Sequence, residues 1–211
     1  MIKILIADDH AIVREGLKQI VSEEPDMVMA GEAGNAGEMF DLLDKDNWDI
    51  VVLDINMPGK SGLEVLKEMK VKYPDLPILI LSMYSEDQYG IRALKAGASG
   101  FLKKVSAPDE LVCAIRKIVN GGKYISDALA EKLAERLDID INSAPHELLS
   151  DREFQIMCQI ATGLSAETIA DGLSISVHTV YSYRNRILEK MNMKSNVELT
   201  QYVMQNKLIE I

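Results

Sequence analysis

The sequence predicts an α/β protein, a doubly wound five-stranded parallel sheet followed by a small all-α domain. Two observations support this prediction. Five short apolar runs alternate with five amphipathic stretches over about the first 120 residues, which is typical of a parallel sheet covered by helices. The third run, Ile50–Leu53, is continuously apolar and rich in β-branched residues, as expected of a strand buried on both faces.

The predicted strands and helices follow one another in strict alternation. We expect strands at Ile2–Ala7, Met27–Ala33, Ile50–Asp54, Pro77–Ser82 and Gly100–Leu102. We expect helices at Ala11–Glu23, Glu38–Asp44, Leu63–Tyr73, Glu86–Ala96 and Pro108–Asn120. Turn residues separate these elements, because Met57-Pro58-Gly59 follows the third strand and Gly121-Gly122 closes the last helix.

A change of pattern after the fifth helix indicates a second domain. Residues 126–137 have the pattern of a linker helix, and residues 138–147 are polar and contain Pro145, which suits a domain boundary. The expected organisation is therefore a domain at 1–122, a linker at 123–147 and a domain at 148–211.

The second domain has the pattern of a helix-turn-helix. A capping box, Ser150–Glu153, opens its first helix, and Ser165 caps a short helix that ends at Leu173. A three-residue turn, Ser174–Ser176, then leads into a longer helix, Val177–Met191. Two helices joined by so short a turn are typical of this DNA-binding motif.

The charge of the chain does not exclude DNA binding. The net charge is −10, but residues 1–125 carry 15 basic and 20 acidic residues, whereas residues 148–211 carry 6 and 7. Residues 181–194 hold four basic residues against one acidic residue, and a local basic face can bind DNA on an acidic protein. No apolar run approaches the roughly 20 residues that span a bilayer. Charged residues also come too early for a signal peptide, so we expect a cytoplasmic protein without membrane contact.

Polar residues follow four of the predicted strands. Asp8 and Asp9 follow the first strand, and Asp54 ends the third. Ser82 ends the fourth strand and Lys104 follows the fifth. Because these strand ends meet at one edge of the sheet, the three aspartates would repel one another, and a Mg²⁺ ion would relieve that repulsion. Asp54 could then attack phosphorus, with Ser82 and Lys104 as donors to the phosphoryl oxygens.

Two other interpretations of the acidic edge have to be weighed. Taken alone, Asp8-Asp9 could simply cap the next helix. The edge could also belong to a phosphohydrolase with an aspartyl-phosphate intermediate, which usually needs a general acid two residues after the nucleophile, and here that residue is Asn56. We therefore expect no turnover enzyme, only Mg²⁺-dependent self-phosphorylation from a phosphodonor and slow self-dephosphorylation.

Both halves of the chain resemble known families. The receiver domain of response regulators, which has a flavodoxin-like fold, has signature blocks similar to Ile4–Asp9, Val51–Gly62, Ile78–Ser82 and Gly97–Lys104. Leu149–Leu208 resembles the LuxR-type helix-turn-helix, so the whole chain resembles a NarL/FixJ-family two-component response regulator. Val180–Arg184 further resembles the subgroup that includes GacA and UvrY.

The resemblance implies roles for the residues of the acidic edge. It implies that Asp54 is the phosphoacceptor and that Asp9, Asp54 and the backbone carbonyl of Asn56 hold Mg²⁺. Asp8 would act mostly through water.

The resemblance also implies a switch formed by Ser82 and Phe101. Phe101 stands where the family usually has a tyrosine, so any switch there must be a change of rotamer and packing. Lys104 would bind phosphoryl oxygens together with Ser82. Lys103 replaces the apolar residue that commonly precedes the active lysine, which makes Lys103 the alternative candidate.

The helix that begins at Val177 is expected to read DNA. Its apolar stripe would pack inward and its polar face would enter the major groove, where Asn can read adenine and Arg guanine. Basic residues would hold backbone phosphates. The expected DNA contacts are Thr179, Tyr181, Ser182, Arg184, Asn185, Arg186, Lys190 and Lys194. The alternative is a helical protein-interaction module that does not bind DNA.

These observations predict a phosphorylation-controlled transcription regulator. A sensor histidine kinase would phosphorylate Asp54, and phosphorylation would control dimerisation and binding to double-stranded DNA. The expected partners are therefore the kinase, DNA and a second copy of the chain.

Overall fold

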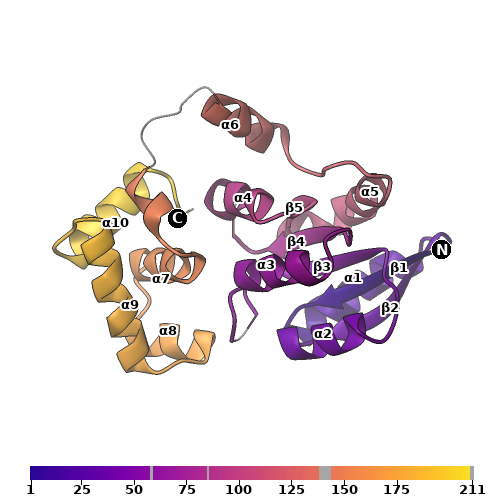
Figure 1. Ribbon diagram of the computed structural model, residues 1–211, viewed down its shortest axis with the longest axis horizontal. Helices are drawn as coiled ribbons and strands as arrows, with labels where there is room; N and C mark the ends of the chain where they lie inside the picture. Colours follow the sequence, from indigo (N-terminus) through magenta and orange to yellow (C-terminus); the bar gives the residue numbers. More distant parts are fainter. Residues whose placement is uncertain (58, 85, 138–143, 210–211) are drawn as a thin grey trace. The chain divides into compact units, whose positions relative to one another are not determined.

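The computed structural model describes residues 1–57, 59–84, 86–137 and 144–209. They form two compact units, Met1–Ala130 and Glu131–Ile211, and the predicted linker at 123–147 spans their boundary (Figure 1). Pro58 and residues 138–143, where the sequence predicts part of a turn and part of the polar linker, lie outside the described residues.

The first unit contains the predicted parallel sheet, with the strand order β2-β1-β3-β4-β5. Its strands are β1 (Ile2–Ala7), β2 (Met27–Ala33), β3 (Ile50–Asp54), β4 (Ile78–Ser82) and β5 (Gly100–Lys103). The chain reverses its direction of winding between β1 and β3, where Ala7 pairs with Leu53. In open α/β sheets, ligands bind beyond the strand ends at such a switch point.

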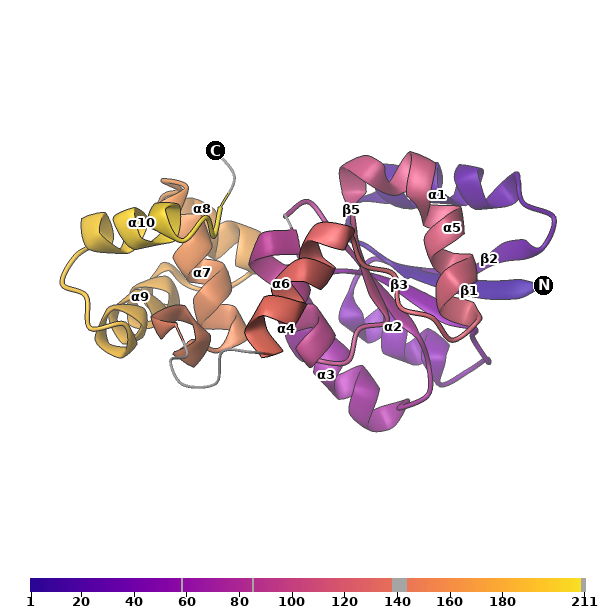
Figure 2. The same ribbon diagram turned by 90° about the horizontal axis from the view of Figure 1, so that it is seen from above.

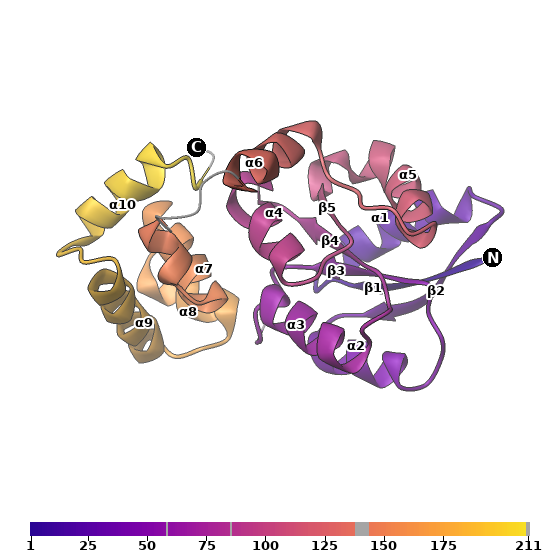
Figure 3. The same ribbon diagram turned by 45° about the horizontal axis from the view of Figure 1, so that its top comes forward.

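Five helices of the first unit cover the two faces of the sheet. They are α1 (Ala11–Ser22), α2 (Ala36–Leu43), α3 (Gly62–Lys72), α4 (Glu86–Lys95) and α5 (Ala107–Val119). Helices α1 and α5 lie on one face, and α2, α3 and α4 lie on the other (Figures 2 and 3). This division follows from the reversal at β1, because crossovers of one handedness place helices on opposite faces when the winding direction changes.

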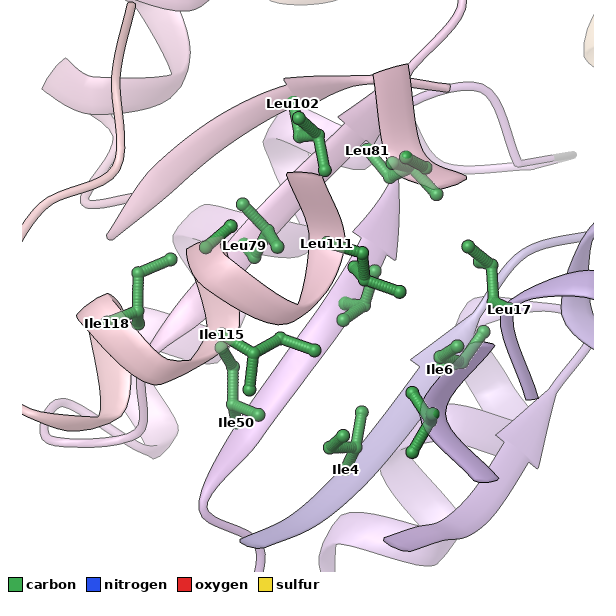
Figure 4. Close-up of a cluster of buried hydrophobic side chains, with 14 of the residues drawn as sticks. Ile4, Ile6, Leu17, Ile50, Leu79, Leu81, Leu102, Leu111, Ile115 and Ile118 are labelled. Atoms are coloured by element: carbon green, nitrogen blue, oxygen red, sulfur yellow. The ribbon is translucent and has the colours of Figure 1, made fainter. Parts of the chain in front are cut away.

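Alternate strand residues build the core beneath α1 and α5 (Figure 4). Burying one such side chain contributes about 1.5–3 kcal/mol, so this layer holds the strand ends in a fixed relation. The labelled members of the cluster are Ile4, Ile6, Leu17, Ile50, Leu79, Leu81, Leu102, Leu111, Ile115 and Ile118.

Helix α6 (Asp127–Leu137) crosses the unit boundary. Four helices of the second unit follow it, namely α7 (Asp151–Ala161), α8 (Ala166–Leu173), α9 (Val177–Lys190) and α10 (Asn196–Gln205). Helix α7 packs against α9 and α10, and α8 packs against α9. A serine caps each of these four helices, as Ser150 and Ser165 were predicted to do. Within the described residues, every helix is too short or too polar to cross a bilayer.

Candidate functional site

The polar residues at the strand ends converge at one edge of the sheet. Lys104 Nζ lies 2.6 Å from Asp8 Oδ2 and 2.7 Å from Asp54 Oδ2. Both carboxylates are buried, and only 8% of the Lys104 side chain is exposed. Lys104 opens a 3₁₀ turn directly after β5, and of the two candidate lysines it is the one whose ammonium joins the two carboxylates.

The charges in this pocket are not balanced by protein groups alone. Burial, together with the neighbouring Asp8 carboxylate, raises the pKa of the Asp54 carboxyl, and the Lys104 ammonium offsets this rise only in part. Burial also disfavours the charged form of Lys104, but the carboxylates of Asp54 and Asp8 outweigh it and raise the pKa of the ammonium. One ammonium group thus serves two carboxylates, which leaves an excess of negative charge.

The loop after β3 holds the Asp54 carboxylate in place. Asn56 N donates to Asp54 Oδ1 at 3.1 Å, while Lys104 occupies the other oxygen. Gly62 N donates to Ile55 O at 3.0 Å and closes the loop. A Cβ at Gly62 would lie 2.5 Å from Ile55 Cα, so only glycine allows this approach.

The acidic edge has the donor set of a divalent cation site. Asp8, Asp9, His10 and Asp54 each offer a ligand atom, and these atoms lie within 4.8 Å of one another. Lys104 Nζ contacts the buried Asp8 Oδ2, and no other donor among the described residues reaches that oxygen. Oxygen donors with surplus negative charge suit a hard cation such as Mg²⁺. The residues present therefore fit the predicted ion.

His10 was not among the predicted site residues. Its Nδ1 lies 2.7 Å from Asp9 Oδ1 and 3.3 Å from Asp8 Oδ1, and its backbone N–H donates to Asp8 Oδ1. The position directly after the aspartate pair was the only signal in the sequence that could have indicated it.

The two predicted switch residues, Ser82 and Phe101, are fully buried. Ser82 ends β4, one position beyond the pairing of Asp54 with Leu81, and its Oγ accepts a hydrogen bond from Tyr84 N at 3.0 Å. The Phe101 side chain is enclosed within the unit. A switch at Phe101 must therefore work through packing, as its lack of a hydroxyl predicts.

The second unit contains the predicted helix-turn-helix in α8 and α9. Ser174 has a φ of 52° and ends α8 in the left-handed conformation, and Ser176 Oγ accepts the Thr179 N–H at the start of α9. Tyr181 is 51% exposed, and Asn185 and Arg186 are also exposed.

The hydroxyl groups of two predicted contacts on α9, Thr179 and Ser182, have partners within α9 or at its cap. Ser182 is half-buried and donates its hydroxyl to His178 O at 3.0 Å. Thr179 Oγ1 lies 2.7 Å from Ser176 Oγ. Their hydroxyl groups contribute to the capping and internal bonding of the helix.

The three basic residues that were predicted to hold phosphates differ in whether their charged groups have partners. Lys190 Nζ donates to the buried Glu153 at 2.7 Å. Arg184 donates to Asn196 Oδ1 at 2.7 Å and to Asn185 Oδ1 at 3.1 Å. Lys194 is exposed, and its ammonium has no partner in the part of the chain that the structure describes.

Comparison with known proteins assigns both units. Residues 4–116 match the response regulator receiver domain, and residues 147–203 match the bacterial regulatory proteins of the luxR family. The chain is a LuxR-family DNA-binding two-component response regulator. It therefore belongs to a family of response regulators and not to one of turnover enzymes.

Full-length relatives support the same assignment. The oxygen regulatory protein NreC of Staphylococcus epidermidis is 35% identical over 216 residues, covering 99% of both chains. The response regulator GacA of Pseudomonas syringae pv. syringae is 35% identical over 211 residues, covering 100% of this chain and 99% of GacA. NreC and GacA are equally similar, so identity alone does not single out the GacA/UvrY subgroup.

A solved structure shows the same fold. The LuxR-family response regulator from Aurantimonas sp. SI85-9A1 has a TM-score of 0.59 and is 36% identical. The match covers 64% of this chain and 96% of that chain.

Proposed function

We propose that Asp54 accepts a phosphoryl group from a sensor histidine kinase and that this phosphorylation controls DNA binding. The observation that carries the proposal is the pocket itself, in which the buried Asp54 shares one ammonium group with Asp8. In a response regulator, a carboxylate in such surroundings is the natural acceptor, because its charge is incompletely compensated and it lies at a ligand-binding edge.

The chemistry needs a nucleophile and positive charge. A carboxylate oxygen of Asp54 forms a bond to phosphorus while the bond between phosphorus and the donor's histidine nitrogen breaks, which leaves an acyl phosphate on Asp54. Lys104 already contacts Asp54 Oδ2 and would donate to the phosphoryl oxygens. Ser82 Oγ accepts a hydrogen bond from Tyr84 N, so its hydroxyl proton remains available for donation to a phosphoryl oxygen.

The residues that would hold Mg²⁺ are Asp9, Asp54 and the backbone carbonyl of Asn56, with Asp8 acting mostly through water. When bound, the ion supplies positive charge that offsets the charge of the transferring phosphoryl group.

The second unit would bind double-stranded DNA through α9. The exposed Tyr181, Asn185 and Arg186 would face bases, Thr179 and Ser182 would lie at the groove, and Arg184, Lys190 and Lys194 would lie near phosphates. We propose that rearrangement at Ser82 and Phe101 favours a homodimer, because helix-turn-helix proteins commonly bind two-fold sites as dimers.

Phosphate incorporation tests the acceptor. We expect the wild-type chain, incubated with acetyl phosphate and Mg²⁺, to gain the mass of one phosphoryl group, and Asp54→Asn to gain none while keeping its far-ultraviolet circular dichroism. Asp41→Asn is a matched control, because Asp41 is an exposed residue of α2. Labelling of Asp54→Asn at the wild-type level would contradict the assignment.

Selection of binding sites from a random DNA pool, with and without acetyl phosphate, tests the DNA-binding half. We expect enrichment of a two-fold symmetric sequence by the phosphorylated chain, and a changed preference at one base position in Asn185→Ala. An unchanged selected sequence in that variant would contradict the placement of Asn185 against a base.

A further inference from the structure

The chain leaves the first unit along the edge strand of the sheet. Tyr124 N donates to Ser99 O at 3.0 Å, and Phe101 N donates to Tyr124 O at 3.0 Å. Tyr124 and Gly100 form a parallel bridge, so the start of the predicted linker continues the hydrogen bonding of the sheet beyond β5. One of these bonds comes from the backbone of Phe101, a predicted switch residue.

The first turn of α6 is seated on α4. Ser126 Oγ donates a hydrogen bond to Glu86 and accepts the Leu129 N–H at 3.2 Å. Leu129 is 1% exposed and lies over Gly90. A Cβ at Gly90 would lie 2.8 Å from Leu129 Cδ2, so any larger residue would displace the leucine.

The seat of Leu129 is connected to the other predicted switch residue. Tyr89, which precedes Gly90, stacks on Tyr84 with 5.0 Å between the ring centroids. The backbone N–H of Tyr84 donates to Ser82 Oγ at 3.0 Å. A movement of Ser82 therefore reaches α4 through one hydrogen bond and one ring contact.

We propose that residues 123–130, which we term the latch, transmit the state of Ser82 and Phe101 to the helix-turn-helix unit. This inference rests on the proposed function, because it names the contacts through which phosphorylation of Asp54 would act on the second unit. When the Ser82 hydroxyl group turns toward a phosphoryl oxygen, the acceptor of Tyr84 N moves and α4 shifts. Leu129 then loses its seat over Gly90, and the chain that leads into the second unit is released.

Amide hydrogen exchange of the full chain measures the latch directly. The backbone N–H groups of Phe101, Tyr124 and Leu129 make the bonds that close it. We expect these amides to exchange roughly tenfold faster after treatment with acetyl phosphate and Mg²⁺, because local opening sets the exchange rate. We expect unphosphorylated Gly90→Ala to show the fast exchange already.

Matched variants separate the latch from general loosening of the fold. Gly16→Ala is the control for Gly90→Ala, because Gly16 also lies in a helix but a Cβ there would meet nothing within 4 Å. Ser126→Ala removes the bond to Glu86 without adding bulk, so it tests the latch if Gly90→Ala fails to fold. It also removes the acceptor of the Leu129 N–H, so in this variant exchange is read at Phe101 and Tyr124. We expect Ser126→Ala to speed exchange in the latch and Gly16→Ala to leave it unchanged.

Phosphate incorporation is measured by mass on the same samples. Unchanged exchange in the latch of a chain that has gained a phosphoryl group overturns the latch and leaves the proposed function intact. Wild-type exchange in both Gly90→Ala and Ser126→Ala overturns it as well. Failure of the wild-type chain to gain a phosphoryl group overturns the proposed function and the latch with it.

Discussion

Two buried carboxylates in this protein each contact a lysine at the same distance, yet their pKa values move in opposite directions. Lys104 Nζ lies 2.7 Å from Asp54, and Lys190 Nζ lies 2.7 Å from Glu153. The pKa of Asp54 is raised by burial, whereas that of Glu153 is lowered overall. Distance between the charges therefore does not decide what an ion pair does.

The difference lies in what surrounds each pair. Lys104 is 8% exposed and is shared with Asp8, so it cannot compensate fully for the desolvation of Asp54. Burial also works against the Glu153 carboxylate, but Lys190, which is 43% exposed, outweighs it together with hydrogen bonds from Ser150. The first pair has the incompletely compensated charge that the proposed phosphoacceptor site requires. The second pair, which we term the clamp, joins α7 to α9.

Removal of Lys104 should have the largest effect. We expect Lys104→Met to slow phosphate incorporation from acetyl phosphate by about 100-fold or more, because one donor to developing negative charge commonly contributes that much. Time-resolved mass spectrometry measures the rate. Lys103→Met is the matched control, and it should remain close to wild type. Equal rates in Lys104→Met and wild type would refute a reactive role for the first pair.

Breaking the clamp should cost stability instead of reactivity. We expect Lys190→Met to lower the free energy of unfolding of the second unit by about 2 kcal/mol, because it leaves the buried Glu153 carboxylate without its cation. Glu153→Gln should lower it by about 1 kcal/mol, since glutamine can still accept the Ser150 N–H. Urea unfolding monitored by circular dichroism gives both values.

An exposed capping carboxylate provides the control for the clamp. Glu198 accepts the Lys194 N–H at the start of α10 but is exposed, so Glu198→Gln should change the free energy of unfolding by less than about 0.5 kcal/mol. Similar losses of unfolding free energy in Glu198→Gln and Glu153→Gln would mean that the stabilisation by Glu153 does not depend on its burial.

The two carboxylates should also give opposite pH dependences. With its pKa raised above the usual 3.8, Asp54 binds its proton more readily in the folded chain. The stability of wild type relative to Asp54→Asn should therefore fall as pH rises from about 4 through the folded pKa of Asp54. Glu153 has a lowered pKa, so the stabilisation that it contributes should be present above about pH 4.5 and lost as pH falls through its folded pKa.

Chemical denaturation across a pH series, with Asp54→Asn and Glu153→Gln measured against wild type, tests both signs. The same sign of pH dependence for both variants would remove the contrast between the pairs.

Mg²⁺ should raise the stability of wild type at neutral pH more than that of Asp54→Asn, because an ion that binds only the folded state stabilises it.

The smallest effect is expected at Lys194, whose ammonium has no partner among the described residues. Lys194→Ala should leave unfolding unchanged and weaken binding to all DNA sequences alike, lowering the slope of log affinity against log salt by about one. Fluorescence anisotropy at several salt concentrations measures the slope. A loss confined to one DNA sequence would instead indicate contact with a base.

The sequence by itself determined the fold and predicted which residues at the strand ends would meet, although it did not indicate His10. Buried strands and amphipathic helices have different hydrophobic periods, so each element could be predicted locally. Because parallel strands end at one edge of the sheet, Asp8, Asp9, Asp54, Ser82 and Lys104 could be placed together without coordinates, and the structure brings Lys104 into contact with Asp8 and Asp54.

Only the tertiary structure decided which charges are compensated. Lys190 and Lys194 look alike as basic residues near the end of one helix, but packing of α9 on α7 brings Lys190 to Glu153, 37 residues away in sequence. The contact of Leu129 with Gly90 likewise depends on how the chain returns from α5 across β5 and α4. Such contacts depend on distances between separate elements, and local periodicity contains no information about those distances.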